Sequence, residues 1–343
     1  SEFFESNSLF SKNQFGFRKG LSTVGTVELL VSGVIGGFEH CSSTLASLCD
    51  LTKAFDCAPH DILLNKLQHY GLNGVELNFF RTYLSDRTQR VYFNNTLSEL
   101  ASVKGGVPQG SVLGPFLFLV LINDLPTNVD CGSVIFADDS TFYCINNDID
   151  TLFVERTHVL HQANHWFSSN GLLLNDNKSQ NILFSLCKNL TLTKYNLNLK
   201  SCVRLLGITL DSKLTWQPHV QSVCCRLSRV IFLLRHLKKL VPKDYLKSAY
   251  YAFFHSTISY GITIWGNSHD IHKVLLLQKK AVRILAGVSS LTTCKPIFVE
   301  EGILTVSNLY IYSCLIKVKQ NLGNFSLRHN INEYSTRDSL CLD

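Results

Sequence analysis

The sequence contains no methionine at any of its 343 positions, and it starts Ser-Glu-Phe-Phe-Glu. That start also lacks the basic and then apolar layout of a secretory signal, so nothing in it directs export. From these absences we expect a fragment of a longer reading frame whose N-terminal portion is missing. We also expect an intracellular protein that is not secreted, with nucleus and cytoplasm equally open.

Long hydrophobic runs are missing as well. No run approaches the roughly 20 apolar residues that a membrane-spanning helix needs, and the best candidate, residues 112–122, is about half that length. We therefore predict no membrane partner. Charged residues are scarce, at 17%, whereas 45% of the residues are hydrophobic. This balance excludes a disordered chain, and a chain of this length can bury more than one core.

The 12 cysteines never show the C-x-x-C spacing of zinc and redox sites. Cys224 and Cys225 are adjacent, which is too close for a metal knuckle. Because the chain is long and carries no export signal, a disulfide framework is not expected. We predict reduced thiols, most of them packed as small apolar side chains.

The net charge of +6 hides an uneven distribution. Residues 1–150 carry 9 Lys and Arg against 16 Asp and Glu, whereas residues 200–250 carry 10 against 2. An acidic half attracts divalent cations and a basic segment attracts phosphates, which fits an enzyme that handles nucleic acid. Ordinary solvated charge explains the same counts equally well, so this asymmetry decides nothing alone.

Internal repeats are absent, so the order of elements comes from periodicity and from helix and strand breakers. Apolar spacing predicts helices over residues 22–40, 61–70, 75–84, 111–124 and 149–170. Strands are expected over residues 45–51, 133–137, 140–145, 182–184 and 203–210, and a hairpin over 90–103. The glycine-rich segment 105–111 can only be a loop. Mixed helices and strands predict an α+β domain for the first two thirds.

The last third changes character near residue 212. Helical spacing predicts helices around residues 223–237, 245–260 and 271–286. The first of these helices has one apolar stripe, made of Val223, Leu227, Val230, Ile231, Leu234 and Leu237. Arg226 and Arg229 lie off that stripe, so the module is helical and basic.

Asp138 and Asp139 separate two strand-like runs, which predicts that the acidic pair forms the turn of a tight hairpin. Asp50 lies near the end of another predicted strand. Most acidic dipeptides are solvated turns, which is the competing interpretation. Apolar strands on both sides make uncompensated charge costly and favour a bound cation. Acids on adjacent strands can hold two divalent ions about 3.5–4 Å apart, as in-line phosphoryl displacement requires.

Six sequence blocks occur in an order that resembles one known family. They cover residues 14–20, 50–56, 106–115, 136–139, 171–178 and 206–211, and they include Gln-Phe-Gly-Phe-Arg-Lys-Gly, Gly-Val-Pro-Gln-Gly-Ser and Phe-Ala-Asp-Asp. Together they are similar to the motifs of non-LTR (LINE-type) retrotransposon reverse transcriptases, especially the jockey-like group. Segments 259–262 and 277–283 resemble the thumb and adjoining part of such elements, so the resemblance covers nearly the whole chain.

The resemblance implies an α+β fold: a right-hand polymerase palm with partial fingers, followed by a mainly helical thumb and a C-terminal helical segment. It assigns residues 1–48 to partial fingers and 49–211 to the palm, which includes some fingers elements. Residues 212–343 become the thumb and C-terminal extension. Complete members have fingers strands ahead of the 14–20 block, and here only thirteen residues precede it.

By the same resemblance the protein is an RNA-directed DNA polymerase, the nucleotidyltransferase of a mobile element. Its implied partners are an RNA template, a DNA primer and deoxynucleoside triphosphates, with an endonuclease elsewhere in the full element. Two alternatives stay open: a catalytically inactive relic that at most binds nucleic acid, and an RNA-templated RNA polymerase. The bulky Phe55 argues against the second.

The resemblance also implies a catalytic site with two Mg²⁺ ions, Mn²⁺ being the alternative. Asp50 and Asp138 are its implied direct ligands, together with the backbone carbonyl of Leu51. Asp139 completes the acidic pair and contributes field more than coordination. Lys178 is implied to reach the triphosphate and protonate the leaving pyrophosphate, although a plain surface lysine explains it nearly as well.

Residues that bind substrate and nucleic acid are implied in the same way. Phe55 matches the ring placed beneath the incoming sugar, where it rejects a 2′-hydroxyl; a core phenylalanine is the alternative. Gln109 and Gly110 lie in the loop against nucleotide and template, for which an ordinary glycine-rich turn is the alternative. For the nucleic-acid backbone, the implied phosphate contacts are Arg18, Lys19, Arg226 and Arg229.

Overall fold

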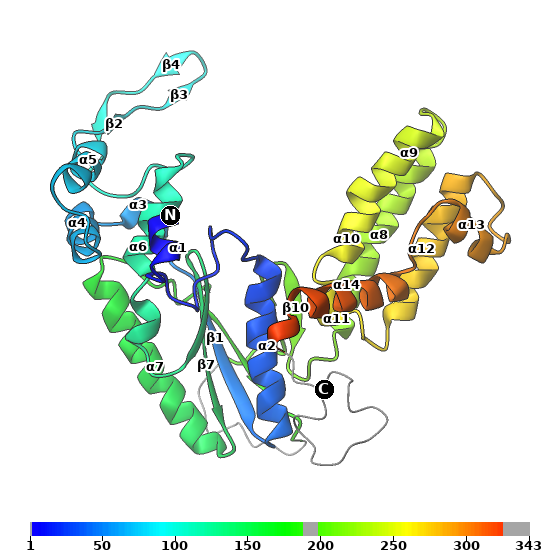
Figure 1. Ribbon diagram of the computed structural model, residues 1–343, viewed down its shortest axis with the longest axis horizontal. Helices are drawn as coiled ribbons and strands as arrows, with labels where there is room; N and C mark the ends of the chain where they lie inside the picture. Colours follow the sequence, from blue (N-terminus) through cyan, green and yellow to red (C-terminus); the bar gives the residue numbers. More distant parts are fainter. Residues whose placement is uncertain (1, 188–197, 325–343) are drawn as a thin grey trace. The chain divides into compact units, whose positions relative to one another are not determined.

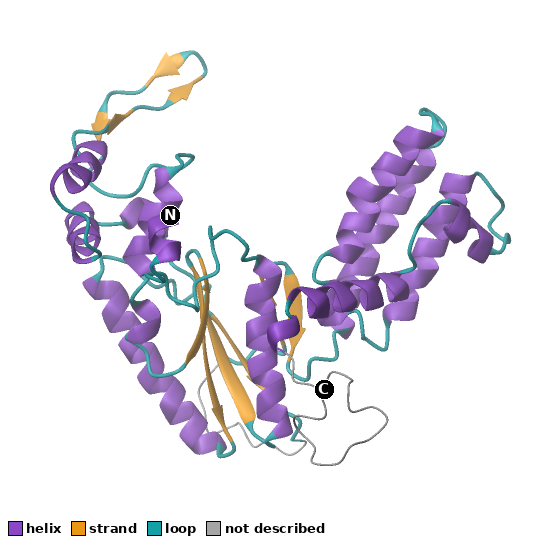
Figure 2. Ribbon diagram, viewed as in Figure 1, coloured by secondary structure: helices purple, strands orange, loops and turns teal. Residues whose placement is uncertain are grey.

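The computed structural model describes residues 2–187 and 198–324. The chain divides into two compact units, Ser1–Leu214 and Thr215–Asp343. In the first unit helices surround a β-sheet, and in the described part of the second unit all regular elements are helices (Figures 1 and 2).

The centre of the first unit is a four-stranded antiparallel sheet with the strand order β6-β7-β1-β8. Its strands are β1 (Ser43–Cys49), β6 (Gly132–Phe136), β7 (Asp139–Asn146) and β8 (Gln180–Phe184). The strands predicted in these four places are confirmed. Because β1 ends at Cys49, Asp50 directly follows the central strand.

Helices α2 (Thr23–Glu39) and α7 (Ile149–Ser169) cover opposite faces of this sheet (Figure 1). Successive side chains of a strand point to opposite faces. In β1, Thr44 faces α2 so closely that a Cβ on Gly37 would lie 2.8 Å from its Oγ1. Ser47 faces the other way and accepts a hydrogen bond of 3.2 Å from Arg156 Nε of α7. Both helices were predicted, and burial on two faces fixes the register of β1.

A large hydrophobic cluster lies on the α7 side of the sheet. It includes side chains from α4 (His60–His69), α5 (Gly74–Leu84) and α6 (Leu113–Ile122), which confirm three predicted helices. All six residues of α6 from Leu117 to Ile122 are buried. An apolar run that seemed half a membrane span is therefore a core helix. Within residues 2–187 and 198–324, no helix has the length and apolar character needed to cross a bilayer.

The predicted hairpin over residues 90–103 is also present. It pairs β2 (Thr88–Gln89) with β5 (Ala101–Ser102), and β3 (Tyr92–Phe93) with β4 (Thr96–Leu97). Asn94 and Asn95 form its tip with φ of 47° and 58°. Two consecutive left-handed residues match the turn type that suits strand twist, and asparagine tolerates that conformation.

The single strand predicted over residues 203–210 is wrong. Residues 203–210 make two strands, β9 (Cys202–Leu205) and β10 (Ile208–Asp211), which pair with each other. The chain reverses at Leu206 and Gly207, whose φ values are 44° and 86°. Short elements that the sequence did not reveal are α1 (Glu2–Ser6), α3 (Ala54–Cys57) and η1 (Leu125–Thr127).

Helix α8 (Gln217–Leu237) opens the second unit and packs on α12 (Ile271–Ala286). Its predicted stripe is confirmed, since Val223, Leu227, Ile231 and Leu234 are buried. The helix predicted over 245–260 is interrupted by a π-helical segment. The remaining elements are α9 (Lys243–Ala249), η2 (Tyr250–His255), α10 (Ser256–Ser259), α11 (Ile262–Trp265), α13 (Cys294–Glu300), α14 (Val306–Gln320) and η3 (Leu322–Asn324).

Candidate active site

Strand pairing brings the three predicted acids together. β1 pairs with β7 as far as Cys49 opposite Ser140, and continuing that register places Asp50 opposite Asp139. β6 pairs with β7 up to Phe136 opposite Asp139, so Ala137 and Asp138 form the two-residue turn between them. The predicted tight hairpin is therefore present, but its turn lies one residue earlier than expected: Asp138 is in the turn and Asp139 is the first residue of β7. Both acids lie beside the end of β1.

Burial and neighbouring negative charge both disfavour ionisation of Asp138 and Asp139. Burial, and then the charge of Asp50, raises the pKa of Asp138, while a hydrogen bond from its own backbone N–H lowers it. Burial, followed by the charges of Asp138 and Asp50, raises the pKa of Asp139, although this side chain still reaches solvent. A cation placed among these groups would offset both the cost of burying their charge and the smaller repulsion between them.

Asp50 is held by the segment that follows α7. Its backbone N–H donates to Ser179 Oγ over 3.3 Å, and its carbonyl accepts from the N–H of Asn175 over 2.8 Å. One carboxylate oxygen, Oδ2, is buried without a hydrogen-bond partner, and the Lys178 ammonium lies 3.6 Å from it. A buried oxygen that lacks a hydrogen bond and has only this long ion pair is expensive, so the atom fits a ligand that is not part of the chain.

A cavity of about 140 Å³ lies next to these groups. Its charged lining side chains are Asp50, Asp139, Lys178 and Arg204, whereas Asp138 does not line it. Arg204 is exposed on β9 and was not predicted as a site residue. The signal for it was weak, because its strand was predicted as part of a longer one without a turn. Acids and bases sharing one cavity suit a ligand that combines a cation with an anion.

No three His, Cys, Asp or Glu side chains within residues 2–187 and 198–324 converge into a ready-made metal cage. The three acids are close enough for their charges to interact, but they are too far apart to enclose an ion by themselves. Mg²⁺ is usually bound through one or two carboxylates plus substrate phosphates, without an all-protein cage. The residues present therefore fit a cation whose shell a substrate completes.

Phe55 lies on α3, five residues after Asp50, and its ring is half-buried. It stacks on the buried ring of Phe118 with centroids 4.3 Å apart and an interplanar angle of 20°. The exposed Phe17 meets it edge-on at 6.2 Å. The ring thus belongs partly to the core and partly to the surface, and its contacts hold it in one orientation.

The glycine-rich loop 105–111 is tied to the segment after Asp50. Gln109 Nε2 donates to Asp56 Oδ1 over 2.7 Å, and the N–H of Val107 donates to the carbonyl of Phe55 over 2.7 Å. Gly106 has a φ of 85°, and a Cβ there would meet the carbonyl oxygen of Asp56 at 2.6 Å. Gly110 also has a positive φ, of 78°, but open space around it.

A second cavity, of about 620 Å³, lies against this loop. Its charged lining side chains are Lys53, Asp56 and Arg87, Gln89 and Gln109 add amides, and the segment from Gly105 to Pro108 also lines it. Two cations and exposed backbone suit an anionic or polar ligand. The predicted substrate residues Gln109 and Phe55 therefore lie on two segments, the loop and α3, that hydrogen bonds hold together. Lys178 lies elsewhere, in the cavity beside Asp139.

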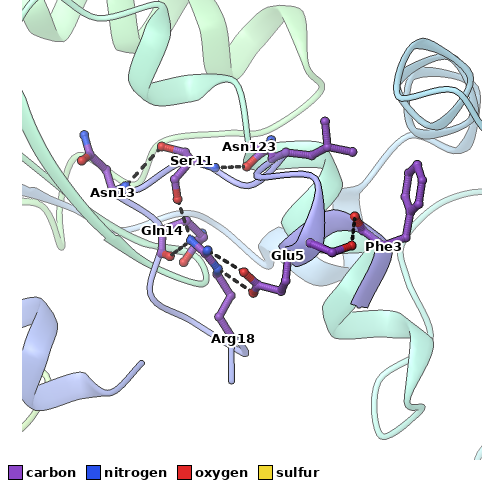
Figure 3. Close-up of polar contacts among 9 residues, drawn as sticks. Phe3, Glu5, Ser11, Asn13, Gln14, Arg18 and Asn123 are labelled. Carbon is purple, nitrogen blue, oxygen red and sulfur yellow. Dashed lines mark hydrogen bonds and ion pairs between the residues drawn. The ribbon is translucent and has the colours of Figure 1, made fainter. Parts of the chain in front are cut away.

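Arg18 does not lie free for a phosphate (Figure 3). Its Nε and Nη2 donate to Glu5 over 2.9 and 2.8 Å, and Nη1 donates to the carbonyls of Ser11 and Gln14. Its side chain is only 13% exposed. This geometry gives Arg18 a structural role in place of the predicted template contact, because guanidinium groups paired on both edges have few donors left. Lys19 beside it is exposed.

Arg226 and Arg229 lie on the exposed side of α8, as their position off the apolar stripe predicted. They are three residues apart and therefore neighbours on the helix surface. Their contact with a nucleic acid stays a prediction, as do the roles of Lys19, Phe55 and Gln109.

Comparison with known protein families matches residues 2–210 to the family described as reverse transcriptase (RNA-dependent DNA polymerase). The probable RNA-directed DNA polymerase from transposon BS of Drosophila melanogaster is 29% identical over 303 residues, covering 80% of this chain and 32% of that protein. The RNA-directed DNA polymerase from mobile element jockey of the same species is 27% identical over 294 residues, with 80% and 32% covered. The chain thus spans about a third of the length of these curated relatives.

Among solved structures, telomerase from Candida albicans in complex with a TWJ fragment of telomeric RNA is similar with a TM-score of 0.51. The sequences are 13% identical, and the match covers 89% of this chain and 57% of that chain. At such low identity the likeness concerns the fold alone. The predicted resemblance to jockey-like reverse transcriptases is confirmed, and so is the mixture of helices and sheet.

Replacing Asp139 with Asn removes a carboxylate whose charge the fold disfavours. Because the folded-state pKa of Asp139 lies above its ordinary value of 3.8, ionisation costs stability at higher pH, and the cost vanishes below that value. We therefore expect Asp139→Asn to raise the Tm by about 1–3 °C near pH 7.5 in the absence of divalent cations. Scanning calorimetry of both proteins near pH 7.5 and below 3.8 measures the difference.

Asp61→Asn is the matched control, since Asp61 is an exposed acid on α4 and does not line the cavity beside Asp50 and Asp139. It should give no pH-dependent gain. An Asp139→Asn protein whose Tm difference from the parent is the same at both pH values would show that the fold does not disfavour the charge of Asp139.

Proposed function

The chain belongs to the reverse transcriptase (RNA-dependent DNA polymerase) family, and from that membership we propose that it is the RNA-directed DNA polymerase of a mobile element. It extends a DNA primer along an RNA template with deoxynucleoside triphosphates. The observation that carries the proposal is the meeting of Asp50, Asp138 and Asp139 at the end of β1 and in the β6–β7 turn.

In this proposal the four-stranded sheet and its helices form the palm, over residues 49–211. Residues 1–48 contribute part of the fingers. The helical unit from residue 212 onward is the thumb with its C-terminal extension. The antiparallel sheet with acids at one end, followed by an all-helical described unit, supports these names.

Asp50, Asp138 and the carbonyl of Leu51 would hold two Mg²⁺ ions, with Asp139 adding negative field. The orphaned Oδ2 of Asp50 and the raised pKa of Asp138 support this donor set. When bound, such ions favour ionisation of the primer hydroxyl and offset charge on the triphosphate. Because the protein supplies only part of the shell, the site would be complete only when nucleotide is present.

We propose that Lys178 pairs with Asp50 in the absence of substrate and with the triphosphate when nucleotide is bound. Its ammonium lies 3.6 Å from Asp50 Oδ2, and its side chain is 69% exposed, so the ion pair is loose. We place it on the triphosphate during turnover, where it would hold the proton for the leaving pyrophosphate. Arg204, which lines the same cavity, adds a second positive charge for phosphate.

Phe55 would exclude ribonucleotides. Its stacking on Phe118 prevents the ring from retreating into the core, so a sugar with a 2′-hydroxyl would collide with it. Asp56 and Gln109 would keep the glycine-rich loop against the nucleotide, since their 2.7 Å hydrogen bond ties that loop to α3. Phosphate contacts by Lys19, Arg226 and Arg229 would make duplex binding weaken as salt rises.

Primer extension on an RNA template tests the function. The parent should extend the primer, and Asp138→Asn should lose more than about 100-fold in rate, because even outer partners of metal ligands are worth about 10–100-fold. Asp61→Asn, the exposed acid on α4, should retain parent activity. Rates of nucleotide incorporation with Mg²⁺ give the comparison.

Extension that survives Asp138→Asn at the parent rate would refute the assignment of the metal-binding acids. A parent that binds primer–template but extends nothing would identify the chain as an inactive relic. Extension with ribonucleotides alone would point to an RNA polymerase that shares the fold.

Phe55→Val tests sugar selection separately. Shortening the ring opens space beneath the sugar, so the preference for deoxynucleotides over ribonucleotides should fall by about 10- to 100-fold. Competition between the two nucleotide types in primer extension measures this ratio. Phe153→Val removes a ring of the same hydrophobic cluster on α7 and should leave the ratio unchanged. Equal ratios in the parent and Phe55→Val would show that Phe55 does not exclude ribonucleotides.

A further inference from the structure

The turn that carries Asp138 contains a strained residue. Ala137 is the first of its two central residues, and its φ is 57°. This left-handed conformation suits glycine at that turn position, whereas the Cβ of alanine makes it unfavourable. Ala137 is 5% exposed, so its backbone has little access to water for compensation. Something else must hold this turn in place.

The side chain of Gln14 contacts both backbone polar groups of Ala137. Gln14 Oε1 accepts from the N–H of Ala137 over 3.1 Å, and Nε2 donates to the carbonyl of Ala137 over 3.4 Å. The same Oε1 accepts from the N–H of Gly16 over 2.8 Å. One amide thus pairs with the strained residue as a neighbouring strand would, and the two N–H donors fix which way the amide faces.

Gln14 is itself rigidly placed. It is 1% exposed and forms a parallel bridge with Ile135 of β6, flanked by hydrogen bonds from Phe15 N–H to the Ile135 carbonyl and from Ile135 N–H to the Asn13 carbonyl. Its own carbonyl accepts from Arg18 Nη1 over 2.9 Å, and Arg18 is paired with Glu5 (Figure 3). The Arg18–Glu5 pair therefore supports the segment that carries Gln14.

Gly16 shows how closely this segment approaches the turn. A Cβ on Gly16 would lie 2.3 Å from the nitrogen of Ala137, closer than any real contact. The segment from Gln14 to Gly16 therefore fits against the turn only with glycine at its end. Sequence motifs placed this segment in the fingers, yet its contacts are with the hairpin of the acids.

We propose that Gln14 is the positioning residue of the metal-binding turn: its amide fixes Ala137 in the left-handed conformation and so aims Asp138 at Asp50. This inference rests on the proposed function and deepens it. Gln14 is buried, so it would contact neither nucleotide nor cation directly. It acts through Ala137, in the way that outer hydrogen-bond partners orient metal ligands.

Mn²⁺ binding to the full chain, followed by electron paramagnetic resonance, tests the proposal without relying on catalysis. Gln14→Met keeps the volume and removes the three hydrogen bonds, and Mn²⁺ affinity should fall about 10- to 100-fold. Gln278→Met is the matched control. Gln278 is fully buried in the second unit and makes three hydrogen bonds, to Tyr250, Leu304 and Val306. Its variant should lose Tm and keep the parent affinity.

Adding Ala137→Gly to Gln14→Met separates positioning from stability. Glycine removes the strain, so Tm should recover, while Mn²⁺ affinity should stay low because nothing aims the turn. Recovery of both would mean that Gln14 only relieves strain and would overturn the proposal. Unchanged Mn²⁺ affinity in Gln14→Met would overturn it too.

Hydrogen exchange on the parent covers the case in which Gln14→Met fails to fold. The Ala137 amide should exchange as slowly as the paired amides of β6 and β7, and exchange at the rate of an exposed loop would contradict the proposal. The proposed function fails separately: a parent that binds Mn²⁺ through Asp138 but extends no primer leaves the role of Gln14 standing. If the parent binds no Mn²⁺, or if Asp138→Asn leaves Mn²⁺ binding unchanged, the inference would be overturned.

Discussion

The pairing of β1 with β7 is the interaction on which the site depends. It places Asp50 opposite Asp139, and the tight β6–β7 turn adds Asp138 to the same place. Side chains alternate along a strand, so a slip of one residue would turn these acids to other faces. Burial of β1 between α2 and α7 prevents that slip, and the core therefore sets the geometry of the chemistry.

This arrangement holds like charges together at a cost to the fold. The raised pKa values of Asp138 and Asp139, the orphaned oxygen of Asp50 and the left-handed Ala137 all oppose folding in the absence of ligand. Sites that bind or react commonly carry such unfavourable features, which are offset elsewhere. Here the offset comes from the surrounding hydrophobic core and from the hydrogen bonds of Gln14, Ser179 and Asn175.

Sequence predicted the features that depend on local patterns. The strands beside Asp50 and around Asp138, the asparagine-tipped hairpin and the stripe of α8 follow from alternation, turn chemistry and helical spacing. It missed what depends on distant partners. The family resemblance implied the phosphate contact of Arg18, and no local pattern indicated its ion pair with Glu5. Nor did any local pattern indicate that Gln14 reaches Ala137, 123 residues away. Leu206-Gly207 was an overlooked turn signal.

Crystals of the chain grown with Mn²⁺ and a deoxynucleoside triphosphate, measured at the manganese absorption edge, test the central claim most directly. Anomalous peaks should lie within about 2.5 Å of carboxylate oxygens of Asp50 and Asp138, since these hard oxygens suit such an ion. At least one ion should contact Asp50 Oδ2, the buried oxygen without a hydrogen-bond partner. Bound nucleotide with no manganese between these two acids, or manganese only at other residues, would contradict it.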